Sequence, residues 1–285
     1  MALLSWVNGQ QNQDVIPTDR GLAFGDGLFE TMRVKDGQIF WLKLHWERLS
    51  LGCKVLAFHF SYDDFMQALK PALQQTKLQP NDVFKLKLIL TRGASTKGYS
   101  APLLLKHNVI ILLSSLSASV NKLRQEGVKL ISCQWPLADS PQLAGIKHLN
   151  RLDQVMAKQE CQHSQCFDGL MYNQAGELIE STSANLFLVK EEAVFTPCIK
   201  NAGVKGVMRR GVMEQLAPMQ QLQIKEQVFT DLEGLTEIFI TNAIIGIVPV
   251  TAVDDRKYPI GAIAQKLQQA LFQCESTIWP KNSLS

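Results

Sequence analysis

The stretch AFGDGLFETMRVKDGQIFWL (residues 23–42) decides the fold class. Apolar residues recur on both sides of Lys35-Asp36-Gly37, and an Asp-Gly pair between two such runs is a strong hairpin signal. The stretch therefore predicts two antiparallel strands joined by a tight turn. Strands paired in this way favour an α/β fold with mixed sheets over a doubly wound parallel sheet.

Strands and helices alternate outward from this hairpin along the whole chain. Helical spacing of apolar residues marks the expected helices, and short apolar or alternating runs mark the strands. In the first half we expect helices over 42–56 and 63–73, the second ending near Pro71, and strands over 83–91 and 109–113. In the second half we expect a strand over 128–133, a helix after Lys147 that carries Leu149, Leu152, Val155 and Met156, a hairpin GLMY-NQAG-ELIES, the strands NLFLV and EIFIT, and a helix over 207–216 between them.

A change of composition at SLSASVNK divides the chain. This small-residue stretch has no periodicity, which is typical of a linker between domains. We expect an N-terminal α/β domain over 1–116, a linker over 117–122 and a C-terminal domain over 123–285 that carries Lys147.

Composition excludes several classes of protein. The formal charge of the 285 residues is only +3, with acidic and basic residues interleaved, so neither nucleic acid nor an anionic membrane is an expected partner. The start MALLSWVNGQQNQDV has no basic region followed by an apolar one, and we expect a cytoplasmic protein. The six cysteines have no framework spacing, and Cys161, His163 and Cys166 have no second ligand pair nearby, so we expect reduced thiols and no metal.

Lys147 is the first candidate for chemistry, in LAGIKHLNRL (143–152). Gly145 permits close backbone approach, and Ile146 and Leu149 are apolar neighbours. A lysine in such surroundings loses hydration, which lowers its pKa and makes the free amine a nucleophile. The alternative is a first-turn helix lysine with its ammonium group in water.

Three other segments could bind a phosphate group. Gly203 and Gly206 precede the expected helix at 207, so the amides of Val207 and Met208 would lie at its positive end. The alternative is an ordinary glycine-containing loop. A strand end carries Thr241 and Asn242, which could cap a helix or bind an anion. Arg48 shares a helix side with His45 and Gly52 and could bind phosphate through two hydrogen bonds, or it could lie on a solvated face.

Glu180 is a candidate of a different kind, a buried carboxylate. It ends a strand directly after Leu178 and Ile179, so we expect its carboxylate to point inward and to need a cationic or hydrogen-bonded partner. A pyridinium nitrogen would supply such a partner. Taken together, a nucleophilic lysine, phosphate donors and this carboxylate are typical of a pyridoxal phosphate site.

The quoted motifs resemble those of the fold type IV pyridoxal-phosphate enzymes. This group holds branched-chain aminotransferases, D-amino acid aminotransferases and aminodeoxychorismate lyases. The resemblance covers nearly the whole chain and rests on DRGLAFGDGLFETMR (19–33), LHWERL (44–49), LTRGASTKGYS (90–100), LAGIKHLNRL (143–152), GELIESTSANLF (176–187), GVKGVMR (203–209) and TNA (241–243).

The resemblance implies a two-domain fold with pyridoxal 5'-phosphate between the domains, and a homodimer. Lys147 would carry the cofactor, and Glu180 would face its pyridine nitrogen with Asn185 in support. The phosphate would be held by Arg48, by the Val207 and Met208 amides, and by Thr241 or Asn242. Thr31 would assist proton transfer. The implied substrate-binding residues are Phe24, Phe29, Arg92, Lys97 and Tyr99.

Three features of the resemblance favour the lyases over the aminotransferases. The stretch LAGIKHLNRL is closer to lyases, the loop TRGASTKGYS resembles their RG…GYS loop, and Thr31 stands where branched-chain aminotransferases commonly have glycine. The implied reaction converts 4-amino-4-deoxychorismate to 4-aminobenzoate and pyruvate, a step toward folate. The alternative is a D-amino acid or branched-chain aminotransferase on the same fold.

Overall fold

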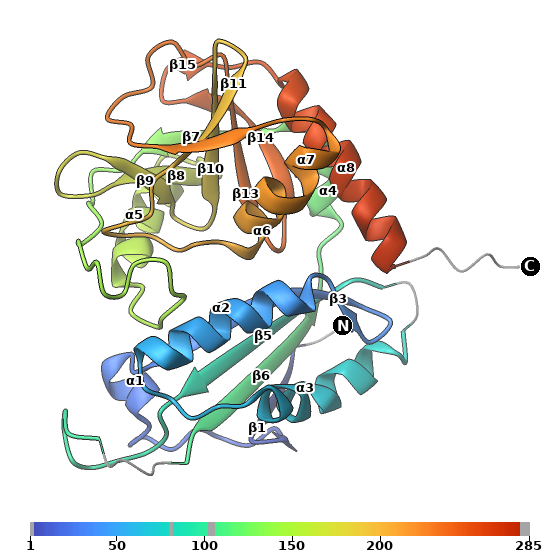
Figure 1. Ribbon diagram of the computed structural model, residues 1–285. Helices are drawn as coiled ribbons and strands as arrows, with labels where there is room; N and C mark the ends of the chain where they lie inside the picture. The colour runs from blue at the N-terminus through green and yellow to red at the C-terminus, as the bar shows by residue number, and fades with distance from the viewer. Residues whose placement is uncertain (1–2, 80–81, 102–105, 280–285) are drawn as a thin grey trace, which may run out of the picture. The chain divides into compact units, whose positions relative to one another are not determined.

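A computed structural model describes residues 3–79, 82–101 and 106–279 (Figure 1). Its contacts divide the chain into two compact units. The N-terminal unit comprises residues 1–116 together with 146–150, and the C-terminal unit comprises 117–145 and 151–285. The lysine segment is therefore grouped with the N-terminal unit, whereas the sequence analysis assigned Lys147 to the C-terminal domain. Residues 119–122 of the expected linker are helical, in α4 (Ser119–Glu126).

The N-terminal unit contains a six-stranded antiparallel sheet in the order β2-β1-β6-β5-β3-β4. Its helices α2 and α3 pack against this sheet. The strands are β1 (Leu4–Val7), β2 (Gln10–Gln11), β3 (Gly27–Lys35), β4 (Gln38–Ile39), β5 (Phe84–Thr91) and β6 (Asn108–Ser115), and the helices are α1 (Arg20–Phe24), α2 (Leu42–Val55) and α3 (Tyr62–Thr76).

The side chains of β3 alternate between the two faces of the sheet, and one of these faces lies in the core. Leu28, Met32 and Val34 are fully buried, and they pair in register with the buried Leu90, Leu86 and Phe84 of β5. Glu30 belongs to the same alternating set, which directs its carboxylate at helix α2 rather than at water. The expected hairpin is confirmed by the pairing of β3 with β4 around Asp36-Gly37.

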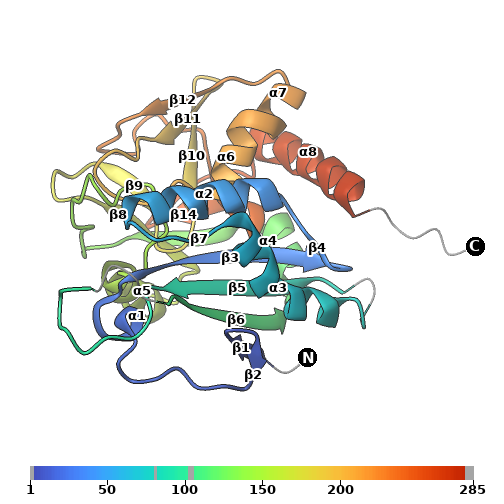
Figure 2. The same cartoon turned by 60° about the horizontal axis from the view of Figure 1, so that its bottom comes forward.

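The C-terminal unit is built on a nine-stranded mixed sheet (Figure 2). Eight strands run in the order β12-β11-β10-β13-β14-β7-β8-β9, and β15 pairs with β14. The pairs β11–β12, β14–β7 and β7–β8 are parallel and the others antiparallel. These strands are β7 (Val128–Ser132), β8 (Asp168–Tyr172), β9 (Leu178–Ser181), β10 (Asn185–Lys190), β11 (Ala193–Pro197), β12 (Ile224–Gln227), β13 (Glu237–Asn242), β14 (Gly246–Val253) and β15 (Arg256–Lys257).

Buried aliphatic side chains from β7 to β14 form the core of this unit, and α4 and α8 pack against β14. The remaining helices are α5 (Leu152–His163), α6 (Val207–Gly211), α7 (Ala217–Met219) and α8 (Ala262–Ile278), with a π-helical turn at Val212–Leu216 between α6 and α7. The expectation of an α/β fold with mixed sheets is confirmed by both units.

Two expected helix boundaries are wrong. Helix α3 continues to Thr76 with Pro71 inside it rather than ending near this proline. The helix expected directly after Lys147 begins only at Leu152, because the residues before it pair with β3.

No helix within the described ranges combines the length and apolarity needed to cross a membrane. Nor do the residues that the structure describes include a group of three or more His, Cys, Asp or Glu able to hold a metal ion.

Candidate active site

The segment that carries Lys147 pairs with strand β3. The Phe29 amide donates to the Lys147 carbonyl at 2.9 Å, and the Leu149 amide donates to the Gly27 carbonyl at 3.0 Å. Leu28 and His148 stand opposite each other in an antiparallel bridge. The backbone of Lys147 is therefore fixed by a sheet edge and not by the first turn of a helix.

The side chain of Lys147 lies over an aromatic ring. Its Nζ is 4.2 Å from the centroid of the Phe29 ring, and Nζ of Lys87 lies 4.9 Å from the same centroid. Thr31 follows Phe29 by two residues on the same side of β3 and stands opposite Lys87 in the β3–β5 register. Lys87 is a residue that the sequence analysis missed, and only this register brings it to Phe29 and Thr31.

Burial lowers the pKa of Lys87, and the nearby charge of Lys85 acts in the same direction. An ammonium group with reduced hydration binds an anionic group more strongly than one in water. Lys87 is thus a further candidate for substrate binding beside the predicted Phe29 and Thr31.

Arg48 lies in a buried cluster with Glu30 and His45. Its Nε donates to Glu30 Oε1 at 2.7 Å and its Nη2 donates to Glu30 Oε2 at 2.6 Å, a bidentate ion pair. His45 Nδ1 is 2.6 Å from Glu30 Oε2, and the Glu30 and His45 side chains are each 1% exposed. The carboxylate of Glu30 thereby fixes the plane and the direction of the Arg48 guanidinium.

The charges in this cluster determine its protonation. Burial would raise the pKa of Glu30, but the Arg48 charge and the His45 contact outweigh it and lower that pKa to about 2. Burial lowers the pKa of His45, and the charges of Arg48 and Lys147 add to this against the opposing effect of Glu30. Glu30 is therefore ionised at neutral pH and His45 is uncharged.

Glu180, at the end of β9 in the C-terminal unit, is buried as expected, with 5% of its surface exposed. Its Oε2 accepts from the Val204 amide at 2.9 Å and from Asn185 Nδ2 at 3.4 Å, and Gln154 Nε2 lies 3.5 Å from its Oε1. These three donors come from the loop before α6, from β10 and from α5.

Asn185 connects Glu180 to the glycine-containing loop before α6. Its Nδ2 donates to the Val204 carbonyl at 2.8 Å and its Oδ1 accepts from the Gly206 amide at 3.1 Å. A Cβ atom on Gly206 would lie 2.0 Å from Asn185 Oδ1, so any larger residue would displace the Asn185 amide. Asn185 thus links Glu180 to the loop before α6, and its supporting role at a cofactor stays a prediction.

Thr241 has an unusual environment at the end of β13. It is fully buried, and its Oγ1 has no hydrogen-bond partner among the described residues. It stands opposite Asn185 in the β10–β13 register, and α6 packs against the same strand. None of the described side chains caps the start of α6, where the amides of Val207 and Met208 lie. Buried hydroxyl groups normally have partners, so Thr241 is suited to donate to a ligand.

Asn242 is engaged in a turn. Its Oδ1 accepts from the amides of Ile244 and Ile245, each at 2.9 Å, and its Nδ2 donates to the Ser183 carbonyl at 3.1 Å. Of the two residues named by the sequence, Thr241 is the one with an unsatisfied polar atom.

Asp168 was also missed by the sequence analysis. It is fully buried and accepts hydrogen bonds from the hydroxyls of Ser181, Thr182 and Ser183, while Lys158 Nζ lies 3.3 Å from its Oδ1. These hydroxyl residues form the turn between Glu180 and Asn185. Asp168 thus fixes the chain that connects two predicted site residues.

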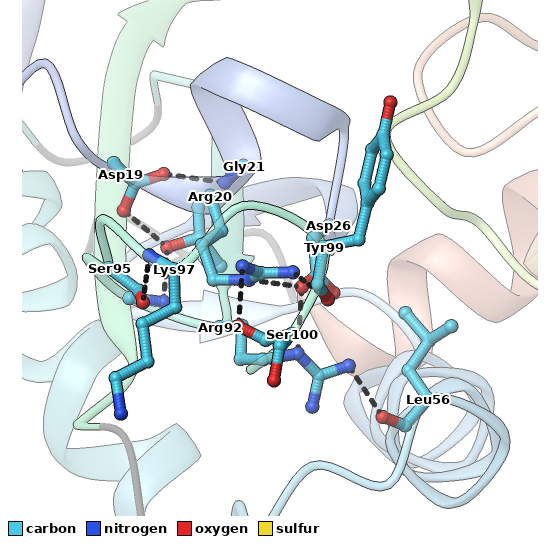
Figure 3. Close-up of polar contacts among 12 residues, drawn as sticks. Asp19, Arg20, Gly21, Asp26, Leu56, Arg92, Ser95, Lys97, Tyr99 and Ser100 are labelled. Atoms are coloured by element: carbon cyan, nitrogen blue, oxygen red, sulfur yellow. Dashed lines mark hydrogen bonds and ion pairs between the residues drawn. The ribbon is translucent and has the colours of Figure 1, made fainter. Parts of the chain in front are cut away.

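Figure 3 shows Arg92, Lys97 and Tyr99, the predicted substrate residues of the loop after β5. Arg92 does not project from this loop, because its Nε donates to Asp26 Oδ2 at 2.7 Å and its Nη2 donates to the Leu56 carbonyl at 2.8 Å. Tyr99 is 89% exposed and its ring lies 5.4 Å from that of Phe24, while Lys97 is also exposed.

The predicted site residues are divided between the two units. In the N-terminal unit, Phe29 is beside Lys147, Thr31 is two residues further along β3, and Phe24 is beside Tyr99. In the C-terminal unit, Glu180, Asn185, the start of α6 and Thr241 lie on adjoining elements.

This fold, with a lysine held at a sheet edge and a buried carboxylate beside a glycine-containing loop, is that of the fold type IV aminotransferases and lyases. The chain belongs to the class IV aminotransferase family, because the sequence model of that family, described as Amino-transferase class IV, matches residues 27–253.

Individual relatives include both lyases and aminotransferases. The chain is 34% identical over 270 residues to an aminodeoxychorismate lyase of Vibrio harveyi, which covers 92% of this chain and 97% of the relative. It is 25% identical over 279 residues to a D-alanine aminotransferase of Staphylococcus epidermidis, covering 93% and 95%. The structure of a 4-amino-4-deoxychorismate lyase from Pseudomonas aeruginosa matches with a TM-score of 0.86 and 35% identity, covering 95% of this chain and 98% of that one.

Proposed function

We propose that this protein is a pyridoxal-phosphate-dependent lyase that converts 4-amino-4-deoxychorismate to 4-aminobenzoate and pyruvate. The observation that carries the proposal is the similarity to two lyases over nearly the full length of each chain. We further propose, from the family resemblance, a homodimer that acts in the cytoplasm.

The residues of the chain fit pyridoxal phosphate. The buried Thr241 hydroxyl without a partner and the uncapped start of α6 are suitable donors for a phosphate group. The family resemblance implies Arg48 as a further, charged donor, and Glu30 holds its guanidinium in a fixed orientation. When bound, the cofactor would supply an electron sink for a negative charge that develops on the substrate carbon.

Lys147 would hold the cofactor and move the proton of the reaction. Its Nζ would accept the proton from the substrate carbon that bears the amino group, and then return it to the oxygen of the departing enolpyruvyl group. Thr31 Oγ1, on the same side of β3 as Phe29, would assist this transfer.

Glu180 would keep the ring nitrogen of the cofactor protonated. The Val204 amide and Asn185 Nδ2 donate to its Oε2 and fix the position of the carboxylate. A carboxylate stabilises a positive charge on a neighbouring nitrogen.

The substrate carboxylates would be bound by lysines. Lys97 is exposed and Lys87 lies at Phe29, while Tyr99 and Phe24 offer aromatic surface. For Arg92 we propose a supporting role instead, because its side chain donates to Asp26 and to the Leu56 carbonyl.

The test is a comparison of two reactions on the purified protein with pyridoxal phosphate. With 4-amino-4-deoxychorismate we expect rapid formation of 4-aminobenzoate. With D-alanine and 2-oxoglutarate we expect a rate at least about a hundredfold lower. The second candidate function, an aminotransferase, is favoured by the D-alanine aminotransferase relative, and the opposite ratio of rates would establish it instead.

A further inference from the structure

Arg20 is a buried arginine that holds the main chain of a surface turn. Only 5% of its side chain is exposed. Its Nη2 donates to the Tyr99 carbonyl at 3.1 Å, and its Nη1 donates to the Gly98 carbonyl and lies 3.5 Å from the Ser100 carbonyl (Figure 3). One guanidinium group therefore binds three consecutive carbonyls, which fixes the path of the turn.

Asp26 joins Arg20 to Arg92. Its Oδ2 accepts from Arg20 Nε at 2.9 Å and from Arg92 Nε at 2.7 Å. Burial alone would raise the pKa of Asp26, but the hydrogen bonds and charges of Arg92 and Arg20 outweigh it and lower that pKa. The bridging carboxylate thus stays ionised and holds both arginines in fixed orientations.

Arg92 anchors this arrangement to the rest of the unit. Its Nη2 donates to the Leu56 carbonyl just after α2, and its guanidinium carbon lies 4.5 Å from the centroid of the Phe58 ring. The base of the loop is also tied to the chain before α1, since the Arg20 amide donates to the Gly93 carbonyl and the Ser95 amide to the Thr18 carbonyl.

The side chains of the turn remain outside this network. Lys97 and Tyr99 are exposed, and the Tyr99 ring packs on Phe24, whose own ring lies 5.0 Å from the Arg20 guanidinium carbon. The network thus restrains the main chain of the turn and leaves its side chains accessible to another molecule.

We propose that Arg20 is a positioning residue that, through Asp26 and Arg92, fixes the Lys97–Ser100 turn so that Lys97 and Tyr99 meet a carboxylate-bearing ring substrate in preset positions. The proposal rests on the proposed function for the identity of that substrate. A turn ordered in advance does not lose conformational entropy on binding, so its contribution to affinity is larger. Lysine cannot replace Arg20, because one ammonium group cannot reproduce the fork of donors that binds several carbonyls.

The first test is steady-state kinetics of the Arg20→Lys holoenzyme with 4-amino-4-deoxychorismate. We expect KM to rise about tenfold or more while kcat falls less than about threefold, with unchanged absorption of the bound cofactor. The matched control is Arg256→Lys, an exposed arginine that donates to the Leu232 carbonyl at 2.6 Å, and its KM should equal that of the wild type. A KM for Arg20→Lys within twofold of the wild type would overturn the proposal.

A double-mutant cycle with Lys97→Ala tests whether Arg20 acts through the turn. If it does, Arg20→Lys in the Lys97→Ala background should raise KM by less than about threefold, since the group that it positions is already absent. The same tenfold factor in both backgrounds would contradict a role through Lys97.

Hydrogen–deuterium exchange separates this proposal from the proposed function. We expect residues 93–101 to exchange at least about fivefold faster in Arg20→Lys than in the wild type, whatever the substrate. Absence of lyase turnover in the wild type would overturn the proposed function. Faster exchange in Arg20→Lys would then still support the restraint of the turn. Unchanged exchange in an active lyase would overturn the positioning role alone.

Discussion

In the two groups of candidate cofactor-binding residues, Arg48 and Thr241 differ in whether their polar atoms have partners. In the N-terminal unit, Arg48 is matched by the ionised carboxylate of Glu30, which His45 also contacts. In the C-terminal unit, Thr241 Oγ1 is buried without a partner among the described residues. The first group therefore contributes to folding through its own contacts, whereas the Thr241 hydroxyl of the second group carries an energetic cost that a ligand can offset.

This difference has a consequence for mutations. Removing a charge from the first group leaves another charge buried, which destabilises the fold. Removing the hydroxyl from the second group removes a desolvated donor and leaves the fold intact. The comparison thus separates residues whose loss changes stability from residues whose loss changes only ligand binding.

The largest expected effect on activity is that of Lys147→Ala. We expect turnover to fall about a thousandfold or more, because the proposed acid–base group is lost. The visible absorption of the bound cofactor should also change. Thermal unfolding should stay near that of the wild type apoprotein, since the backbone contacts of Lys147 with Phe29 remain. A variant with normal turnover would remove Lys147 from the mechanism.

Glu30→Gln should have the largest effect on stability, a loss of about 3–5 kcal/mol in the free energy of unfolding, because Arg48 then lacks its buried counter-ion. Because folding lowers the pKa of Glu30 from 4.5 to about 2, its ionised form stabilises the wild type above about pH 4.5, and this contribution is lost as the pH falls toward 2.

Urea unfolding between pH 6 and pH 3 measures both effects. The stability of Glu30→Gln should depend less on pH than that of the wild type in this range. The control Glu233→Gln, at an exposed glutamate, should follow the wild type. An equal pH dependence in Glu30→Gln would show that Glu30 does not carry this linkage.

Thr241→Val tests the buried hydroxyl of the C-terminal unit that has no described partner. We expect the free energy of unfolding of the apoprotein to be unchanged or higher, since valine has no hydroxyl to leave unsatisfied. The Kd for pyridoxal phosphate should rise about tenfold, the worth of one hydrogen bond to a charged group. Fluorescence titration and urea unfolding measure the two quantities.

Thr196→Val is the matched control for Thr241→Val, because Thr196 is equally buried but donates to the Leu186 carbonyl at 2.8 Å. Thr196 Oγ1 also accepts from Arg209 Nε at 3.1 Å, so Thr196→Val should lose at least about 1 kcal/mol of stability because two made hydrogen bonds are removed. If Thr241→Val destabilised the apoprotein as much as Thr196→Val, the contrast between the two units would fail.

The smallest expected effect is that of Thr31→Val, about a tenfold fall in kcat with the Kd for pyridoxal phosphate unchanged. Valine keeps the shape and the strand preference of threonine, so only the hydroxyl is tested. Thr31→Ser restores the hydroxyl and should recover most of the rate. Equal kcat values in Thr31→Val and the wild type would exclude the proton-transfer role.

The sequence was sufficient for features that depend on local pattern. Asp36-Gly37 predicted the hairpin, and the apolar residues before Glu180 predicted its burial. Glu30 could have been found in the same way, because it alternates with Leu28 and Met32 and must therefore point at the core.

Features that depend on tertiary pairing were not accessible. The helical spacing of Leu149 extended the helix after Lys147 too far toward the N-terminus, because pairing with Gly27 of β3 determines the actual backbone there. Arg92 was assigned to substrate because no local signal shows its partner Asp26, 66 residues away in the sequence. Lys87 is brought to Phe29 and Thr31 only by the β3–β5 register.

The most direct test of the account is the fate of the atoms of 4-amino-4-deoxychorismate. After complete conversion by the purified protein with pyridoxal phosphate, chromatography should detect 4-aminobenzoate and pyruvate in equal amounts, with all of the amino nitrogen in 4-aminobenzoate. Recovery of that nitrogen on an added 2-oxo acid, without pyruvate, would contradict the lyase and establish an aminotransferase.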